Sequence, residues 1–438
     1  MSEAFIAFAG MLGLIALRVP IAFAMGIVGY IGYGLVVGWE PALKMATTAT
    51  YETGLSYSLS VVPLFILMGN FVSRAGLSDE LYQASNAFLG HRRGGLAMAT
   101  VVACGGFSAV CGSSLATAAT MSKVAYPPMR RFGYSDALAT GSIAAGGTLG
   151  ILIPPSVILV IYGILTESDI GKLFIAGVVP GILGVMLYLV AVMITVRLNP
   201  KSGPPGIRTG WHERLIALRG VWGVVVLFVL VIGGIYGGVF TPTEAAGIGA
   251  SGSFLFALAR RRLTLRGIFD VLVESVRTTS MIFFVLIGAL MFSNYINITS
   301  LPTGLVEWVT SLDVSPLIVV VLIMGVYVIL GCVLESLSMI LLTVPVFYPV
   351  MVGLDFGDFM DPEMVLIWFG IVIVVVTEIS LITPPVGLNV FVLRSVLPEV
   401  KLSTIFRGVT PFWCMDIVRL MLLVFIPPLS LYLPSLMG

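Results

Sequence analysis

The sequence predicts an all-α polytopic membrane protein built as an inverted-topology repeat, with two re-entrant hairpins and two broken transmembrane helices. Of its 438 residues, 58% are hydrophobic and only 10% are charged, with a mean hydropathy of +1.09. A soluble domain carries about 25% charged residues. Two hydrophobic segments, GTLGILIPPS (147–156) and TEISLITPPVG (377–387), are each broken by a Pro-Pro pair. A double proline removes two backbone N–H donors, so such a break survives in a membrane only where protein or a polar cavity satisfies the freed groups.

The first part of the chain alternates apolar segments with more polar connections. Residues 4–37 are long enough for one tilted or kinked span, interrupted at Arg18, because a span needs about 20 residues. A polar connection over 38–57 leads to a second span over 58–73. Residues 79–93 have the pattern of an amphipathic surface helix.

Residues 94–127, rich in Gly, Ala, Ser and Thr, predict a re-entrant hairpin with its tip at 112–114. Each arm is then about 14–17 residues, too short to cross a hydrocarbon core of about 30 Å. The same stretch could instead form one long span. The first Pro-Pro pair then breaks a span over 134–165, and 172–196 crosses back. A basic linker, 197–219, is the expected boundary between the two halves.

The second half repeats the order of hairpin and broken helix. Its expected segments are spans at 220–240 and 243–259, an amphipathic surface helix at 263–276, a span at 278–297, a second re-entrant hairpin at 315–351 with its tip at 334–338, a broken span at 364–394 and a last span at 409–434. A shift of 222 residues places Ser114 on Ser336, and a shift of 230 places the first Pro-Pro pair on the second. This is the pattern of an internal repeat.

The positive charges indicate the orientation. With this threading, 19 of the 23 Lys and Arg residues fall on one side, and only Lys44 and Lys172 fall on the other. Arg18 and Arg419 lie within spans. The basic side is expected to be cytoplasmic, so the two hairpins open to opposite sides. If both hairpins were full spans, the charges would divide 14 to 7, so the distribution favours hairpins.

The tips and the breaks carry candidate ligand residues. The unpaired groups at helix ends suit ions, carbonyl groups a cation and N–H groups an anion, and hydroxyl side chains add oxygen atoms. The candidates for a cation site are Gly112, Ser113, Ser114, Gly147, Thr148, Gly150, Glu335, Ser336, Ser338, Glu378 and Thr383. For an isolated tip, small residues would be better explained by close helix packing. The matching breaks in an inverted repeat favour the cation site.

Four carboxylates lie in apolar segments, where an ionisable group is costly and is a functional candidate by default. Glu335 at the second tip and Glu378, six residues before a Pro pair, are the stronger candidates to coordinate a cation, carry a proton or pair with an arginine. Glu244 is at least as well explained as a helix cap. Asp416 is expected to pair with Arg419 at i, i+3.

The absence of familiar catalytic and nucleotide-binding motifs from the sequence argues against an enzyme. The sequence contains no nucleotide-binding P-loop, H-E-x-x-H or CxxC motif. Its four cysteines lie in apolar segments, as small packed hydrophobes do. CGSS (111–114) is poorly suited to serine-nucleophile chemistry because no histidine lies in a span to serve as its base. We therefore expect neither an enzyme nor an organic cofactor, and no nucleic-acid partner.

Several stretches resemble the large membrane subunit of TRAP (tripartite ATP-independent periplasmic) transporters. They are VPLFILMGNFVSRAGLSDELY (62–82), the run from HRRGGLAMATVV to GVVPGIL (91–183), GGVFTPTEAAG (237–247) and the 331–390 block. Together they are spread over almost the whole chain, and the long central run is quite specific. The chain departs from the family pattern at CGSS, where SGSS is more usual, and at ESLS, where other small residues more often follow the acidic one. Both departures keep small hydroxyl residues at the tip.

The resemblance implies a sodium-coupled secondary transporter for small organic anions, such as dicarboxylates or sugar acids, with an elevator-type ion-transporter fold. It would lie in the cytoplasmic (inner) membrane of a bacterium or archaeon. Residues 94–165 and 315–395 would form the moving transport domain. Residues 1–93, 166–314 and 396–438 would supply scaffold helices, surface arm helices, the basic linker and the terminal span. The implied partners are a small four-helix membrane subunit, a periplasmic substrate-binding protein that delivers the anion, and the lipid bilayer.

The resemblance also implies where the ions bind. Sodium, the coupling ion, would bind at the first tip with 147–150 and at the second tip with Thr383, and would offset the charge of an anion at mid-membrane. The anion would bind between the tips, near Ser114, Pro154, Pro155, Ser156, Ser336, Pro384, Pro385 and Asn389. Two alternatives stay open: a stand-alone anion/cation symporter of related fold, and a membrane assembly subunit without transport of its own.

Overall fold

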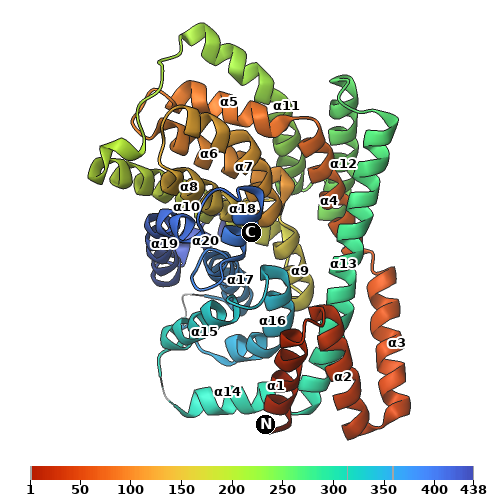
Figure 1. The fold of residues 1–438 in the computed structure, drawn as a ribbon. Helices are drawn as coiled ribbons and strands as arrows, with labels where there is room; N and C mark the ends of the chain where they lie inside the picture. Colours follow the sequence, from red (N-terminus) through yellow and green to blue (C-terminus); the bar gives the residue numbers. More distant parts are fainter. Residues whose placement is uncertain (1, 313, 358–359, 438) are drawn as a thin grey trace.

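The computed structural model describes residues 2–312, 314–357 and 360–437, which form helices and turns and contain no strand. The α-helices (Figure 1) are α1 (Ser2–Ala16), α2 (Ile21–Val37), α3 (Trp39–Leu55), α4 (Val61–Arg74), α5 (Leu77–Leu89), α6 (Gly95–Cys111), α7 (Ser114–Arg131), α8 (Asp136–Thr148), α9 (Val157–Thr166), α10 (Ile170–Leu198), α11 (Trp211–Tyr236), α12 (Pro242–Ala259), α13 (Leu265–Ile298), α14 (Leu301–Ser311), α15 (Pro316–Leu330), α16 (Ser336–Gly353), α17 (Pro362–Ser380), α18 (Leu388–Val396), α19 (Leu402–Phe425) and α20 (Pro428–Leu431). Short 3₁₀ helices are Ser58–Ser60, Leu149–Ile151, Pro200–Ser202 and Pro434–Leu436. The predicted all-α fold class is confirmed.

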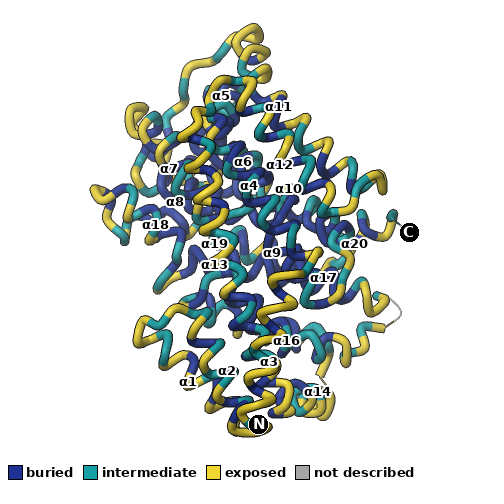
Figure 2. Tube along the Cα trace, turned by 90° about the vertical axis from the view of Figure 1, so that its right-hand side faces the viewer, coloured by how far each residue is buried: buried dark blue, intermediate teal, exposed yellow. Residues whose placement is uncertain are grey.

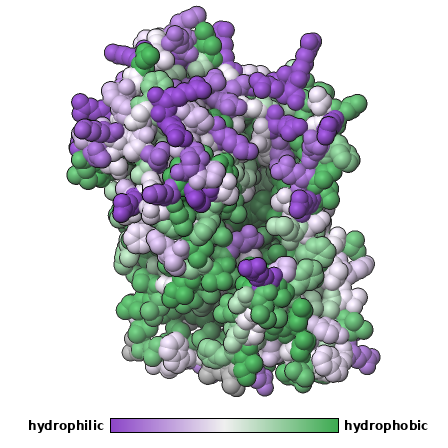
Figure 3. Space-filling model, in the orientation of Figure 1, coloured by the Kyte–Doolittle hydropathy of each residue, from purple (hydrophilic) through white to green (hydrophobic). Residues whose placement is uncertain are grey.

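The long apolar helices identify a membrane protein. Among the described helices, six are long and apolar enough to cross a bilayer: α10, α11, α13, α16, α17 and α19. A seventh candidate is α3 together with the segment from Ser58 to Arg74, two parts that meet at a bend of 58°. Hydrophilic side chains gather at the end of the molecule that carries α5 and α11, and most of the remaining surface in this view is hydrophobic (Figure 3). A multi-pass membrane protein is therefore confirmed, whereas its orientation stays a prediction.

Several predicted segments differ from the structure. The polar connection expected over 38–57 is instead the helix α3, the linker expected over 197–219 ends in the first turns of α11, and the last span expected over 409–434 is α19, which begins at Leu402 and ends at Phe425. The single span expected over 4–37 is instead two helices, α1 and α2. Arg18 ends α1 with a φ of 67°, the Val19 N–H bonds the Leu14 carbonyl at 3.0 Å and the Arg18 N–H bonds the Ile15 carbonyl at 2.8 Å, which is a Schellman-type helix end. Conversely, the surface helix expected over 263–276 and the span over 278–297 are one continuous 34-residue helix, α13. No proline interrupts that stretch, and its polar first turns continue the same helix.

The predicted helix cap at Glu244 is confirmed. The Thr241 N–H donates to Glu244 Oε2 at 2.9 Å, and the Glu244 N–H donates to Thr241 Oγ1 at 3.3 Å. Together they form a reciprocal capping box at the start of α12, which has Pro242 in its first turn. This carboxylate therefore satisfies backbone groups at a helix start.

The internal repeat is visible in the helix bounds. α7 and α16 are both 18 residues long, and the predicted shift of 222 superposes them end to end. Each is followed by a helix that breaks at a Pro-Pro pair: α8 and α9 flank Pro154-Pro155, and α17 and α18 flank Pro384-Pro385. Both Pro-Pro peptide bonds are cis. The two predicted broken helices are thus confirmed.

The helices before each break form hairpins. In the first, the chain turns between α6 and α7 at Gly112 and Ser113. The other ends of the two arms lie close together, since the Leu96 N–H at the start of α6 donates to Tyr134 Oη just after α7 at 3.1 Å. In the second, α15 and α16 turn at 331–335, and the rings of Tyr327 and Phe347 lie 6.0 Å apart. The hairpin shape is confirmed. That each hairpin enters and leaves the membrane by the same face stays a prediction.

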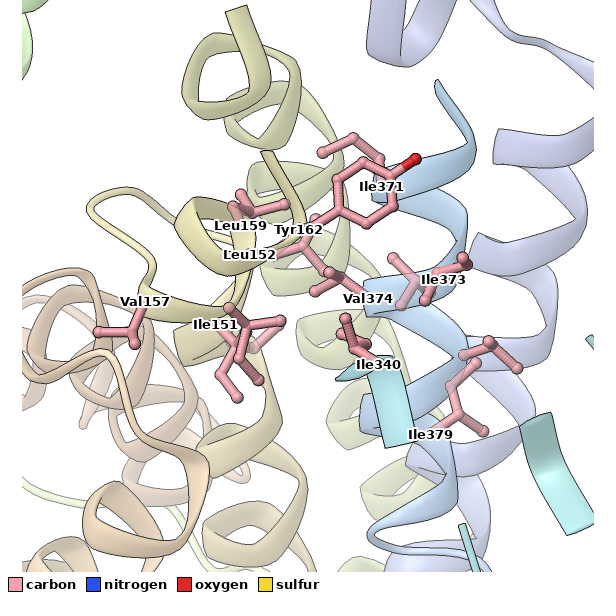
Figure 4. Close-up of a cluster of buried hydrophobic side chains, with 14 of the residues drawn as sticks. Ile151, Leu152, Val157, Leu159, Tyr162, Ile340, Ile371, Ile373, Val374 and Ile379 are labelled. Atoms are coloured by element: carbon pink, nitrogen blue, oxygen red, sulfur yellow. The ribbon is translucent and has the colours of Figure 1, made fainter. Parts of the chain in front are cut away.

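The core forms where the two halves of the repeat meet. Figure 2 shows the buried residues concentrated in the interior around α9 and α17, and every residue from Val365 to Ser380 in α17 is buried. Apolar side chains from the first break and α9 face Ile340 of α16 and the α17 residues in Figure 4. Tyr162 of α9 also donates its hydroxyl proton to the Leu366 carbonyl at 2.6 Å.

The helices after each broken helix pack with the hairpins. α10 contacts α6, α8, α9 and α17, and α19 contacts α8, α10, α17 and α18. On the other side, α13 packs along α2 and α4, and α4 packs along α12. Two packing groups result: the hairpin group (α6–α10 and α15–α19) and the α4 group (α2, α4, α12 and α13). Which of them moves stays a prediction.

Candidate functional site

The two hairpin tips meet at one buried carboxylate. Ser336, the first residue of α16, donates its hydroxyl proton to Glu378 Oε1 at 2.9 Å. Ser114, the first residue of α7, donates to the other oxygen, Oε2. Glu378 itself lies near the end of α17 and has no exposed surface. Serines from opposite halves of the repeat thus bind the two oxygens of a single side chain.

Local sequence explains why these serines stand at helix starts. Ser113 is the N-cap of α7, with an extended φ of −137°, and its hydroxyl oxygen accepts the Ala116 N–H at 3.4 Å. Gly112 before it has a φ of 63°, a left-handed conformation that glycine adopts at no steric cost. At the other tip Glu335 is the N-cap of α16. Both tips therefore direct the first turn of a helix, with its unpaired N–H groups, toward Glu378.

A cavity of about 270 Å³ adjoins the tips. It is lined on one side by tip residues, including Gly112, Ser113, Ser114, Glu335 and Ser336, and by apolar residues of the first break and α9. Its other wall comes from α4 and α13 and supplies Asn70, Glu274 and Thr278. If each water takes about 30 Å³, the cavity has room for roughly nine waters. A small organic acid fits in the same space. None of the described lining residues is lysine, arginine or histidine.

The α4 and α13 residues were missed from the sequence. Asn70 is an amide within an otherwise apolar segment, and that polarity was a usable signal. Glu274 fell in the segment expected to lie on the membrane surface, so it was not considered as a cavity residue. In the structure, Asn70 Nδ2 donates to Ser275 Oγ at 2.8 Å, which joins α4 to α13 beside the cavity.

The predicted residues of the first break lie against the first tip. A Cβ atom on Gly147 would lie 3.0 Å from the Ser114 carbonyl oxygen, and one on Gly150 would lie 2.6 Å from Ser108 Oγ. Glycine at both positions thus lets α8 and its continuation approach the hairpin backbone closely. Thr148 is fully buried, and its hydroxyl lies 2.7 Å from the Ala145 carbonyl and 2.9 Å from Tyr188 Oη.

The predicted residues of the second tip and break are also bonded within the protein. Ser338 donates to Glu335 Oε1 at 3.2 Å. Thr383 donates to the Ile379 carbonyl at 2.7 Å and accepts the Trp413 Nε1–H at 2.9 Å. The oxygen atoms of these residues are grouped around the second tip and the end of α17, but Thr383 and Ser338 do not line the cavity.

The residues predicted for the anion are divided between the cavity and the interior. Ser114 and Ser336 line the cavity, whereas neither Pro-Pro pair does. Ser156 is fully buried and caps α9, with its hydroxyl oxygen accepting the Leu159 N–H at 3.2 Å. Asn389 is fully buried and donates to the Ala144 carbonyl at 3.2 Å, which ties α18 to α8. The prolines shape the two breaks that hold the site, and the structure brings only the two serines of this set into the cavity.

A second buried polar group lies close by. The predicted Asp416–Arg419 pair is confirmed: Oδ1 and Nη2 are 2.8 Å apart, and both side chains have no exposed surface. Tyr188 donates to Asp416 Oδ2 at 2.5 Å and lies beside Thr148, so the pair is connected to the first break.

The donor atoms suit a hard cation. Hydroxyl, carboxylate and backbone carbonyl oxygens gather at the tips, and oxygen ligands are what hard cations bind. The helix starts add N–H groups suited to an anion. An arrangement of this kind, at a pair of broken helices in an inverted repeat, is characteristic of the central sites of secondary transporters.

Comparisons with known proteins agree with this geometry. Residues 8–429 match the family model described as "Tripartite ATP-independent periplasmic transporter, DctM component". The C4-dicarboxylate TRAP transporter large permease protein DctM of Pseudomonas aeruginosa is 40% identical over 390 residues, covering 89% of this chain and 88% of that protein. The sialic acid TRAP transporter large permease protein SiaM of Vibrio cholerae is 30% identical, covering 98% and 97%. The 2,3-diketo-L-gulonate TRAP transporter large permease protein YiaN of Escherichia coli is 32% identical, covering 96% of each.

Solved structures share the fold at low sequence identity. The YdaH transporter of Alcanivorax borkumensis matches with a TM-score of 0.61 and 14% identity, covering 88% of each chain. MtrF of Neisseria gonorrhoeae matches with a TM-score of 0.59 and 13% identity, covering 92% of this chain and 85% of that one. At this identity the likeness concerns the arrangement of helices alone.

Proposed function

The chain belongs to the DctM component family of tripartite ATP-independent periplasmic transporters, and on that premise we propose that it carries out sodium-coupled uptake of a small organic anion. As a large permease subunit of this family it is a multi-pass inner-membrane transport protein and not an enzyme. The proposal rests above all on one observation: the serines of both hairpin tips converge on Glu378 beside a cavity of about 270 Å³.

Bound sodium makes it favourable for the anion to enter this cavity. No basic side chain lines the described wall, and Glu274 and Glu335 already place two carboxylates there. An organic acid anion entering alone would meet unfavourable charge at a depth where charge is poorly solvated. Sodium ions held by the tip oxygens offset that charge, so the cation binds first and the anion follows.

The substrate class is a small organic acid. The relatives are named for a C4-dicarboxylate, for sialic acid and for 2,3-diketo-L-gulonate, all of which carry carboxyl groups. A periplasmic binding protein delivers the acid and a small membrane subunit braces the chain, in keeping with the tripartite organisation named for the family. Transport then proceeds by an elevator movement, in which the hairpin group carries the site past the α4 group.

The test is uptake into proteoliposomes that contain this chain and both partners. Uptake should require an inward sodium gradient. A Ser114→Ala, Ser336→Ala double variant should lose at least about tenfold in uptake at limiting sodium, because two cation ligands are removed. Ser253→Ala is a matched control, since that buried serine bonds only the Ala250 carbonyl in α12, and it should leave uptake unchanged.

Each of the other outcomes would contradict a different part of the proposal. Wild-type sodium dependence in the double variant would count against the tips as the sodium site. Uptake that needs no binding protein would indicate a stand-alone symporter. Absence of any solute flux with the correct partners would indicate an assembly subunit.

A further inference from the structure

The hydroxyl groups at the tips take their direction from ionised Glu378, because an ionised carboxylate can only accept hydrogen bonds. A serine hydroxyl carries one proton and two oxygen lone pairs. Ser114 and Ser336 both donate that proton to Glu378, one to each carboxylate oxygen. Neither serine has a second proton to give. What each of them presents to the cavity is therefore an oxygen lone pair.

This direction decides which ion the tip serines can bind. An oxygen lone pair attracts a cation and repels the oxygen atoms of a carboxylate. Both serines line the cavity, whereas Glu378 does not and has no exposed surface. Glu378 does not line the cavity, so it can act on an ion there only through the two hydroxyl groups.

We propose that Glu378 is a positioning residue that orients both tip hydroxyls, so that Ser114 and Ser336 bind sodium and not the organic anion. The inference rests on the proposed sodium-coupled transport and assigns one of its ions to specific atoms. It also links the two halves of the repeat, because a single carboxylate sets the hydroxyl direction at both tips. The anion is then held by other groups of the cavity, on the side away from the serine oxygens.

Glutamine at this position provides the sharpest test, because it keeps the size of the side chain and changes its hydrogen bonding. The amide nitrogen of glutamine donates, so the serine beside it must accept and turn its own proton elsewhere. That serine then presents a proton to the cavity where the wild type presents a lone pair. Aspartate keeps two accepting oxygens, although it is one methylene shorter.

The experiment measures the dependence of uptake on sodium and on the organic anion separately, in proteoliposomes with both partners. For Glu378→Gln, the sodium concentration giving half-maximal uptake should rise at least about tenfold, because a ligand of a charged ion is reversed. The KM for the anion at saturating sodium should stay within about twofold of the wild-type value, because Glu378 and the reversed hydroxyl contact no anion. Glu378→Asp should shift the sodium dependence less than Glu378→Gln.

Glu363→Gln is the matched control. Glu363 lies in the first turn of the same helix, 15 residues before Glu378, where it is half exposed and pairs with Lys172 at 2.9 Å. It should leave both dependences unchanged. Wild-type sodium dependence in Glu378→Gln, an equal loss in the anion KM, or a larger sodium shift in Glu378→Asp would each overturn the inference. Uptake by the wild type that ignores sodium would instead overturn the proposed function itself.

Discussion

Arg419 is a charge held in the interior of a membrane protein. Its guanidinium group has no exposed surface, pairs with Asp416 at 2.8 Å and lies 5.9 Å from the centre of the Tyr188 ring. Gly184 makes room for it, because a Cβ atom there would lie only 2.2 Å from Nη1. A buried pair of this kind is costly to form and still more costly to leave half-made.

Removing one partner of this pair should therefore cost more than removing both. Asp416→Asn leaves Arg419 buried without a countercharge and should destabilise the folded state by about 3–5 kcal/mol. Adding Arg419→Met should recover most of that loss. Thermal or denaturant unfolding of the purified protein in detergent measures both effects.

The control for this prediction is the partly exposed pair of Lys172 and Glu363, whose side chains are 23% and 51% exposed. Lys172→Met there should cost about 0–1 kcal/mol, because exposed pairs contribute little. If the Asp416→Asn, Arg419→Met double variant were less stable than Asp416→Asn alone, the pair would have a role beyond mutual compensation of charge.

At the scale of single residues, the sequence predicted which side chains belong to the site but not which of them are in contact. Ser114, Ser336 and Glu378 could all be identified as candidates, because small hydroxyl residues at a tip and a carboxylate in an apolar segment are visible in the chain. Their shared hydrogen bonds could not, because the serines lie 264 and 42 residues from Glu378 and only packing brings them together. Glu274 was missed for the same reason, since its role depends on what α13 faces.

At the scale of elements, α8 and α19 cross with their backbones in close contact. A Cβ atom on Gly408 would lie 1.9 Å from the Ala137 carbonyl oxygen, and one on Gly141 would lie 2.2 Å from the Gly408 oxygen. Small residues at such a crossing let the two backbones touch, which is how helices associate in a membrane. The contact fastens α19, with its ion pair, to the first broken helix.

A methyl group at this crossing should loosen the hairpin group. Gly408→Ala should destabilise the protein by about 1–3 kcal/mol, because neither backbone can give way without moving a helix. Gly247→Ala in α12 is the control, since nothing lies within 4 Å of its added Cβ atom. That change should be neutral or stabilising by about 0.5–1 kcal/mol. Equal stability of the two variants in unfolding experiments would contradict the close α8–α19 contact.

Element order could be predicted well and element boundaries less well. The repeat of α7 and α16, and the breaks at the Pro-Pro pairs, follow from local sequence, because proline and glycine impose backbone geometry wherever they stand. The division at Arg18 was missed because arginine gives no local signal for the left-handed conformation that it adopts there. The continuity of α13 was missed because the change from polar to apolar composition was interpreted as a break between two helices. Such a change indicates only that the helix passes from one environment into another.

At the scale of the whole molecule, the two packing groups meet where α4 faces the first hairpin and α10. Gly69 of α4 lies against the end of α6 in the first hairpin, where an added Cβ atom would lie 2.9 Å from the Val110 carbonyl oxygen. The rings of Phe65 and Phe174 also meet across this boundary, 6.0 Å apart. The sequence could not predict that α10 and α19 join the hairpin group, because helix partners are chosen by surface shape across long separations. Figure 1 shows the α4 group along one side of the molecule.

An elevator movement requires the first hairpin to pass Gly69. A branched side chain there should therefore obstruct transport more than binding. Gly69→Leu should reduce the turnover of sodium-driven uptake at least about tenfold, because its side chain would meet backbone on the facing hairpin. Stabilisation of the purified variant by sodium against thermal unfolding should persist, because both tips and Glu378 are unchanged. Gly247→Leu, which projects into open space, should transport at the wild-type rate. Wild-type turnover in Gly69→Leu would mean that the hairpin does not slide along α4. Loss of sodium stabilisation together with turnover would mean instead that Gly69 serves to shape the site.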